Sequence, residues 1–156
     1  MTTRSGKFTA AILLGLAVSG SPLAEEPVTP KLTDKLSRLL QQEMRSVQSA
    51  MATIHTAMVT GEHDTVAASA QQIHDSFILQ QKLTDQDRKD LMSVVPKGFI
   101  RLDKEFHKLA ASLAEAGRKQ NTKKQRQLYD EMTRNCIACH GKYVSDRFPG
   151  VNTAKN

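Results

Sequence analysis

The sequence has no tryptophan and few aromatic residues of any kind, with two Tyr and five Phe among 156 residues. Its basic residues do not alternate with aromatic ones, so it does not resemble a nucleic-acid-binding domain. No stretch alternates apolar and polar residues as half-buried strands do. No carboxylate pair, glycine-rich phosphate loop or Ser/His/Asp arrangement stands out, and we therefore expect no enzyme.

Long apolar runs are also absent. The run from Phe8 to Val18 is too short to span a bilayer. It follows Arg4 and Lys7 and precedes a stretch of small residues, which is typical of a secretory signal peptide covering residues 1–24. A retained membrane anchor is the alternative.

Removal of this leader leaves one domain, residues 25–150, and a short tail, residues 151–156. We expect this chain to be exported to the periplasm and not to span a membrane after processing. Without Arg4 and Lys7, 20 basic residues face 16 acidic ones, a net charge of +4. Such a surface favours acidic redox partner proteins.

Cysteine is scarce, but both cysteines lie in one short motif, Cys136-Ile137-Ala138-Cys139-His140. The pattern C-x-x-C-H is the attachment signature of a c-type haem. Each thiol can form a thioether to one vinyl group, and the imidazole can reach the iron. On a helix, Cys136, Cys139 and His140 share an arc of roughly 100°. In bacteria this attachment takes place outside the cytoplasm, which agrees with the leader.

A redox dithiol, a structural disulfide and half of a zinc site are the competing interpretations. A redox C-x-x-C usually accompanies a βαβ pattern, which is not seen here. A zinc site needs a second ligand pair at short spacing, whereas His55, His63, His74 and His107 are scattered. One covalently attached haem c is the favoured cofactor.

Apolar residues recur at spacings of three and four in four long segments. The first segment runs to Gly61 and the second to about Gln81. A third ends at Gly117, and the fourth carries the motif. A short helical turn is expected from Thr84 to about Met92. The pattern predicts an all-α fold, an antiparallel four-helix bundle with the haem attached to the last helix. The predicted stripe of the first helix is Leu36, Leu40, Met44, Val47, Met51, Ile54 and Met58.

A four-helix pattern with C-x-x-C-H on the last helix, after a signal peptide, resembles the class II c-type cytochromes, the cytochrome c′ and low-spin cytochrome c556 group. The resemblance covers about Thr29 to Phe148 and includes Tyr143, an aromatic residue three positions past His140. The segment from Met44 to Met51 is similar to the c556 pattern, in which the first of two methionines binds iron. The family contains homodimers formed through the first two helices, so a homodimer is one expectation.

The sixth iron ligand decides the function. Helix lengths counted from the ends of antiparallel first and fourth helices place Leu40 and Met44 at the level of His140. If Met44 binds iron, the site is six-coordinate and low-spin and suits electron transfer. If Leu40 or another apolar group covers the iron, the site is five-coordinate. The resemblance to cytochromes c′ then implies binding of nitric oxide or carbon monoxide.

Other residues have two interpretations each. Arg134 is a candidate partner for a haem propionate or a solvated surface arginine. Tyr143 and Phe148 are candidates for packing at the haem edge or in the core. His55 is expected to be a core histidine rather than an iron ligand. The basic residues between Arg118 and Arg126 are expected to be a solvated loop, or a docking patch for an acidic partner.

Overall fold

The protein is all-α, with helices packed against one another, as predicted. The computed structural model describes residues 26–76 and 83–151, and no strand occurs within those two ranges. The elements are a 3₁₀ helix η1 (Thr29–Lys31) and the helices α1 (Asp34–Thr60), α2 (His63–Asp75), α3 (Asp85–Val94), α4 (Lys97–Arg118) and α5 (Thr122–Tyr143). The predicted leader lies outside the described residues.

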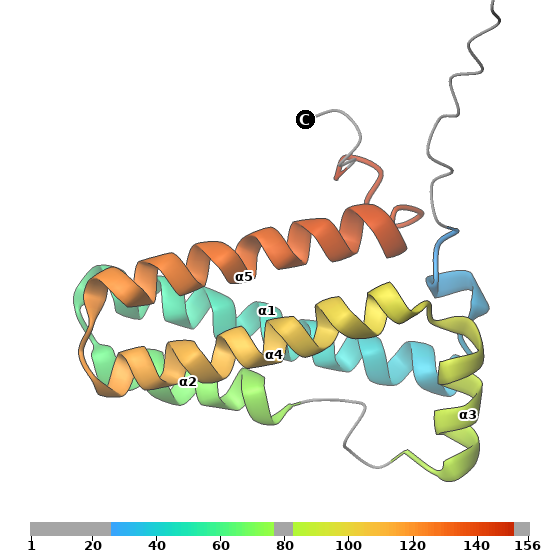
Figure 1. Ribbon diagram of the computed structural model, residues 1–156, viewed down its shortest axis with the longest axis horizontal. Coiled ribbons are helices and arrows are strands. Elements are labelled where there is room, and N and C mark those ends of the chain that lie inside the picture. Colours follow the sequence, from blue (N-terminus) through green and yellow to red (C-terminus); the bar gives the residue numbers. More distant parts are fainter. Residues whose placement is uncertain (1–25, 77–82, 152–156) are drawn as a thin grey trace, which may run out of the picture.

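Figure 1 shows α1, α2, α4 and α5 lying side by side along the long axis, while the shorter α3 crosses one end. The chain reverses direction between α1 and α2, and again between α4 and α5. The end of α5 therefore returns to the beginning of the described chain. There the Val28 amide donates a hydrogen bond to the Tyr143 carbonyl at 2.8 Å.

Helix α1 ends at Gly61, as the sequence predicts, and begins after Thr33. The Thr33 hydroxyl accepts a hydrogen bond from the Leu36 amide at 3.3 Å, which caps the N-terminus. At the other end Gly61 has a φ of +79°, a left-handed conformation that costs glycine little. The buried face is rotated from the predicted stripe, because several stripe residues are only partly covered. That face consists of Leu36, Glu43, Val47, Ala50, Ile54 and Ala57.

Helix α2 is shorter than predicted. It ends at Asp75, and the prediction of an end near Gln81 is wrong. The reason is local: the Ser76 hydroxyl and the Ser76 amide both donate to the Ile73 carbonyl, at 2.9 and 3.3 Å. Such a side-chain bond competes with helix continuation. Phe77, which the pattern placed on this helix, lies outside the described residues.

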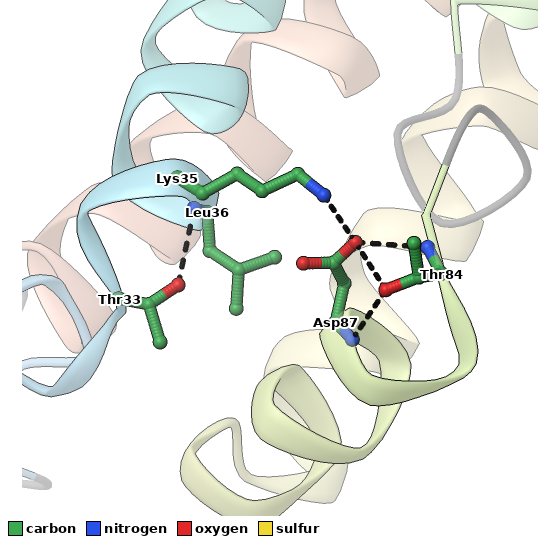
Figure 2. Close-up of polar contacts among 5 residues, drawn as sticks. All are labelled: Thr33, Lys35, Leu36, Thr84 and Asp87. Carbon is green, nitrogen blue, oxygen red and sulfur yellow. Dashed lines mark hydrogen bonds and ion pairs between the residues drawn. The ribbon is translucent and has the colours of Figure 1, made fainter.

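Helix α3 extends the predicted short turn to ten residues and is fastened at its start (Figure 2). The Thr84 hydroxyl accepts from the Asp87 amide, and the Asp87 carboxylate accepts from the Thr84 amide, which forms a capping box. The same carboxylate pairs with the Lys35 ammonium of α1 at 2.5 Å. This contact ties α3 to the first turn of α1.

The apolar core forms two clusters along the long axis. The larger is built on α1, α2, α4 and α5, and includes Ile54, Val66, Leu113, Leu128 and Met132. The smaller lies at the α3 end and consists of Val28, Leu36, Leu83, Leu91, Val95, Phe99 and Tyr143. Among the described residues, no helix is both long enough and apolar enough to cross a membrane.

Candidate functional site

The predicted motif lies in the last two turns of α5, at the border between the two apolar clusters. Cys136 packs against the larger cluster and Cys139 against the smaller one. Both cysteines are free and partly buried. Since the segment is helical, the two thiols and the His140 imidazole share one face of α5. This is the arrangement that haem attachment through neighbouring thioethers requires.

The environment of the thiols does not favour a redox dithiol. Burial raises the pKa of the Cys136 thiol. Burial, with smaller effects of the negative charges of Asp103 and Cys136, raises the pKa of the Cys139 thiol to about 12. Reactive C-x-x-C cysteines instead have lowered pKa values, because the thiolate is the nucleophile. Both thiols are therefore neutral near neutral pH.

His140 is half-buried, and burial lowers the pKa of its imidazole. The neutral form, which keeps a nitrogen lone pair for a metal, is thus favoured at neutral pH. The Phe148 ring stacks on the His140 ring, with centroids 4.7 Å apart and planes 12° apart. Phe148 reaches this position because the chain turns back after α5, where its amide donates to the Val144 carbonyl at 3.1 Å. Phe148 thus packs against the His140 ring rather than in the core.

A zinc site finds no support in residues 26–76 and 83–151. Within them no three or more His, Cys, Asp or Glu side chains are grouped so as to hold a metal ion. A disulfide between Cys136 and Cys139 is not present either.

Tyr143 belongs to the core of the α3 end. Its side chain is 1% exposed and its ring meets the Phe99 ring edge-on, with centroids 5.7 Å apart. The approach to α4 requires Gly98, because a Cβ at that position would overlap the Tyr143 hydroxyl. Tyr143 follows Cys139 by one turn, and Cys139 packs against the cluster to which Tyr143 belongs.

Arg134 is placed away from the motif. Its guanidinium is exposed and pairs with the Asp130 carboxylate one turn earlier. On a helix Arg134 lies roughly 160° from Cys136 around the axis. The structure therefore shows the solvated arginine and does not bring Arg134 together with the cysteines.

Helix α5 contacts α1 at the flank that carries Met51 and His55. We call this flank the α1–α5 seam and include in it Leu40, Met44 and Met58, which share its angular position by helical spacing. Contact is made through Tyr129, whose hydroxyl donates to the Met51 carbonyl at 3.3 Å. The Tyr129 and His55 rings lie 6.1 Å apart. His55 is exposed, so the prediction of a core histidine is wrong: its stripe faces this partly open seam rather than the apolar interior.

The Tyr129 contacts set the axial offset between the two helices. His140 lies eleven residues beyond Tyr129, or roughly 16 Å along α5. Eleven residues back from Met51 and His55 on the antiparallel α1 are Leu40 and Met44. Both share the flank that meets Tyr129, within about 40° around the axis. These contacts are independent of helix lengths and lead to the same two residues opposite His140.

A site for a flat apolar group should leave large apolar side chains exposed when the group is absent, and the chain has such side chains. Met44 is 37% exposed, Ile137 47% and Phe148 43%. Ile137 lies inside the motif, Phe148 stacks on His140, and Met44 belongs to the seam, at the level derived from the Tyr129 contacts. A porphyrin bound to Cys136 and Cys139 is a planar apolar group of the kind that would cover such surface. The residues present therefore fit a haem.

A polar cluster that the sequence pattern did not predict lies beside this site and is formed by Glu43, Asp103 and His107. The His107 Nε2 atom lies 3.5 Å from Glu43 Oε1 and 3.8 Å from Asp103 Oδ1. A signal was present, because Asp103 and His107 continue the stripe of Phe99 and Phe106 at helical spacing, and Glu43 lies seven residues after Leu36. Charged residues at stripe positions are buried if they find partners.

The other predicted polar residues have structural partners. The His63 ring contacts the buried Gln125 amide at 3.0–3.3 Å, and the His74 Nδ1 atom lies 3.1 Å from the His107 carbonyl oxygen. In the predicted basic patch, Arg118 and Lys119 both pair with Glu115.

Comparison with protein-family models, with curated proteins and with solved structures finds no match to this chain.

Proposed function

We propose that this protein is an exported mono-haem c-type cytochrome, an antiparallel four-helix bundle that carries electrons and catalyses no reaction of its own. In this proposal Cys136 and Cys139 hold haem c through two thioethers, and His140 and Met44 are the axial iron ligands. The observation that carries it is the C-x-x-C-H motif on one helical face, with both thiols free and His140 half-buried. When bound, the haem would supply a one-electron couple.

The side chains around the motif support this role. Burial favours the neutral imidazole of His140, the form that binds iron. Phe148 stacks on that ring and limits its rotation. Met44 offers a thioether from the opposite helix, and His/Met ligation raises the reduction potential. A site with both axial positions filled by the chain needs little rearrangement when the iron changes oxidation state.

A second candidate function follows because the same axial offset, counted from Met51, leads to Leu40 instead of Met44. The hydrogen bond from Tyr129 to Met51 leads to Leu40, which is partly buried on the same flank as Met44. If Leu40 rather than Met44 lies over the iron, the sixth position is open. The protein would then bind a small gas such as nitric oxide or carbon monoxide.

Optical spectroscopy of the protein, expressed with its leader in a host that makes c-type cytochromes, tests both candidates. A pyridine haemochrome assay shows whether haem is covalently attached. A low-spin ferric spectrum with a methionine–iron charge-transfer band, and no carbon monoxide binding after reduction, supports the electron carrier. A high-spin spectrum with ready carbon monoxide binding favours the gas-binding protein. Absence of covalent haem overturns both.

A further inference from the structure

The buried cluster of Glu43, His107 and Asp103 places one imidazole between two carboxylates. The His107 Nδ1 atom lies 2.9 Å from the Ile73 carbonyl oxygen, so Nδ1 carries a hydrogen and donates it. The Nε2 atom faces both carboxylates, at 3.5 and 3.8 Å, which favours a second hydrogen there. Among themselves, one imidazolium and two carboxylates carry a charge of −1. One further proton on a carboxylate would remove it.

Asp103 is the group best placed to accept that proton. Its Oδ1 atom faces His107, and its Oδ2 atom is buried with no hydrogen-bond partner in the part of the chain that the structure describes. Of the two carboxylates, Asp103 is the one whose negative charge acts on Cys139, where the haem would be held. A protonated carboxyl has less need of hydrogen bonds than a buried carboxylate, since an unpaired buried charge is costly. The Glu43 carboxylate lies across the same imidazole and adds to the negative charge.

The cluster lies at the level of the haem-attachment motif. Tyr143 meets α4 at Gly98 and Phe99, and Cys139 lies four residues before Tyr143 on a helix of opposite direction. The same distance along α4 from Gly98 and Phe99 leads to residues 102 and 103. The negative charge of Asp103 also contributes to the raised pKa of the Cys139 thiol, which requires the two side chains to be near each other.

Each helix packed against the cluster contributes a charged or titratable group. Glu43 comes from α1, and α2 contributes the Ile73 carbonyl and His74, whose Nδ1 contacts the His107 carbonyl. On α4 the positive charge of Lys104 acts on Asp103, and on α5 the charge of Asp103 acts on the Cys139 thiol. Among these groups Asp103 and His107 lie on one helix, four residues apart, and act as a pair.

We propose that Asp103 takes up one proton when the haem held by Cys136 and Cys139 takes up one electron, and releases it on oxidation. The electron comes from the redox partner and the proton from water, so charge balances in each direction. This inference rests on the proposed function. Its physical reason is electrostatic: an added electron removes one positive charge from the iron, and a nearby carboxylate then binds a proton more tightly.

The titration range of Asp103 suits such coupling. Burial, reinforced by the charge of Glu43 and opposed by that of His107, raises the pKa of Asp103 to about 6. Burial alone lowers the pKa of His107, but the hydrogen bond to Glu43 and the charge of Asp103 outweigh it and the pKa is raised. Near neutral pH the chain therefore holds an ionised Asp103 beside an imidazolium. Reduction raises the pKa of Asp103 further and brings it toward the ambient pH.

The test is the midpoint potential of the holoprotein measured from pH 5 to pH 9. We expect the potential to fall with rising pH above about pH 6, with a slope of up to about 59 mV per pH unit, the value for one proton per electron. The Asp103→Asn variant, which keeps the shape but cannot titrate, should have a flat potential in this range. At pH 8 that potential should lie above the wild-type value, since a negative charge near the iron has been removed.

The matched control is Glu105→Gln, which removes one negative charge from the exposed side of the same helix and should keep the slope. If Asp103→Asn does not fold, two wild-type measurements remain: the slope itself, and proton uptake on reduction in weakly buffered solution followed with an indicator dye. A flat wild-type potential, or an undiminished slope in Asp103→Asn, would overturn the inference. Both outcomes require a haem-loaded protein, so they differ from failure of the proposed function, in which no covalent haem is found.

Discussion

The Tyr129 hydroxyl of α5 donates a hydrogen bond to the Met51 carbonyl of α1, with an O···O distance of 3.3 Å. This contact fixes how far one helix is shifted along the other, and with it which residues of α1 lie opposite His140. Counted from Met51, this level lies roughly 16 Å along α1, at Leu40, and the same distance counted from His55 leads to Met44.

Met44→Leu is expected to convert a low-spin haem into a high-spin one that binds carbon monoxide after reduction. The potential should fall as well, because a thioether ligand that favours ferrous iron is lost. Absorption spectra and redox titration measure both effects. Met51→Leu, the same substitution two turns away on the same flank, should leave the spin state unchanged. If the two variants exchange behaviour, the offset derived from Tyr129 is wrong by two turns.

Replacing either cysteine with serine is expected to leave haem attached through a single thioether. The double variant should bind haem only non-covalently, because a serine hydroxyl does not form a thioether. Extraction with acidified organic solvent separates the cases: haem stays with each single variant and leaves the double variant. Haem retained by the double variant would show that these cysteines are not the attachment points.

The Lys35–Asp87 contact in Figure 2 predicts how the stability of the protein depends on pH. Hydrogen bonds from Lys35 and Thr84 lower the pKa of Asp87 from 3.8 to about 2. A carboxyl with a lowered folded-state pKa contributes stability above its unfolded pKa, and the contribution is lost as the pH falls toward 2. Asp87→Asn should therefore lower the Tm at pH 7 and match the wild type near pH 2.

Asp85→Asn is the control for this measurement, because Asp85 is exposed in the first turn of the same helix. Its effect on the Tm should be smaller at pH 7. An equal loss in both variants would mean that the first turn of α3 responds to charge alone and not to the contact with α1.

Two valines allow the contribution of the core to the free energy of unfolding to be measured. Val66 is fully buried between helices, whereas Val59 is 76% exposed. Val66→Ala should lower the free energy of unfolding by about 2 kcal/mol, through lost transfer free energy and the cavity left behind. Val59→Ala removes the same atoms from the surface and should change it by no more than about 0.5 kcal/mol. Chemical denaturation of both variants makes the comparison, and similar losses would contradict the burial of Val66.

Much of the fold follows from local sequence. The end of α1 at Gly61 and the start of α3 at Thr84 lie where the pattern predicts, because each depends on residues within one helical turn. The end of α2 does not lie where the pattern predicts. The Ser76 hydroxyl donates to the Ile73 carbonyl, and an apolar pattern carries no information about such a bond. Likewise, the buried face of α1 is displaced from the predicted stripe because Glu43 is inside and Met44 is partly outside.

The sequence by itself determined that this protein is helical, that Cys136, Cys139 and His140 share a face, and that several residues compete to lie opposite them. A helical period repeats every 3.6 residues, so it identifies a face but not the neighbour of that face or its axial offset. Only the tertiary structure decided those, through Tyr129 against Met51 and His55. It also decided that Asp103 and His107 meet Glu43, because burying a charge depends on partners from distant parts of the chain.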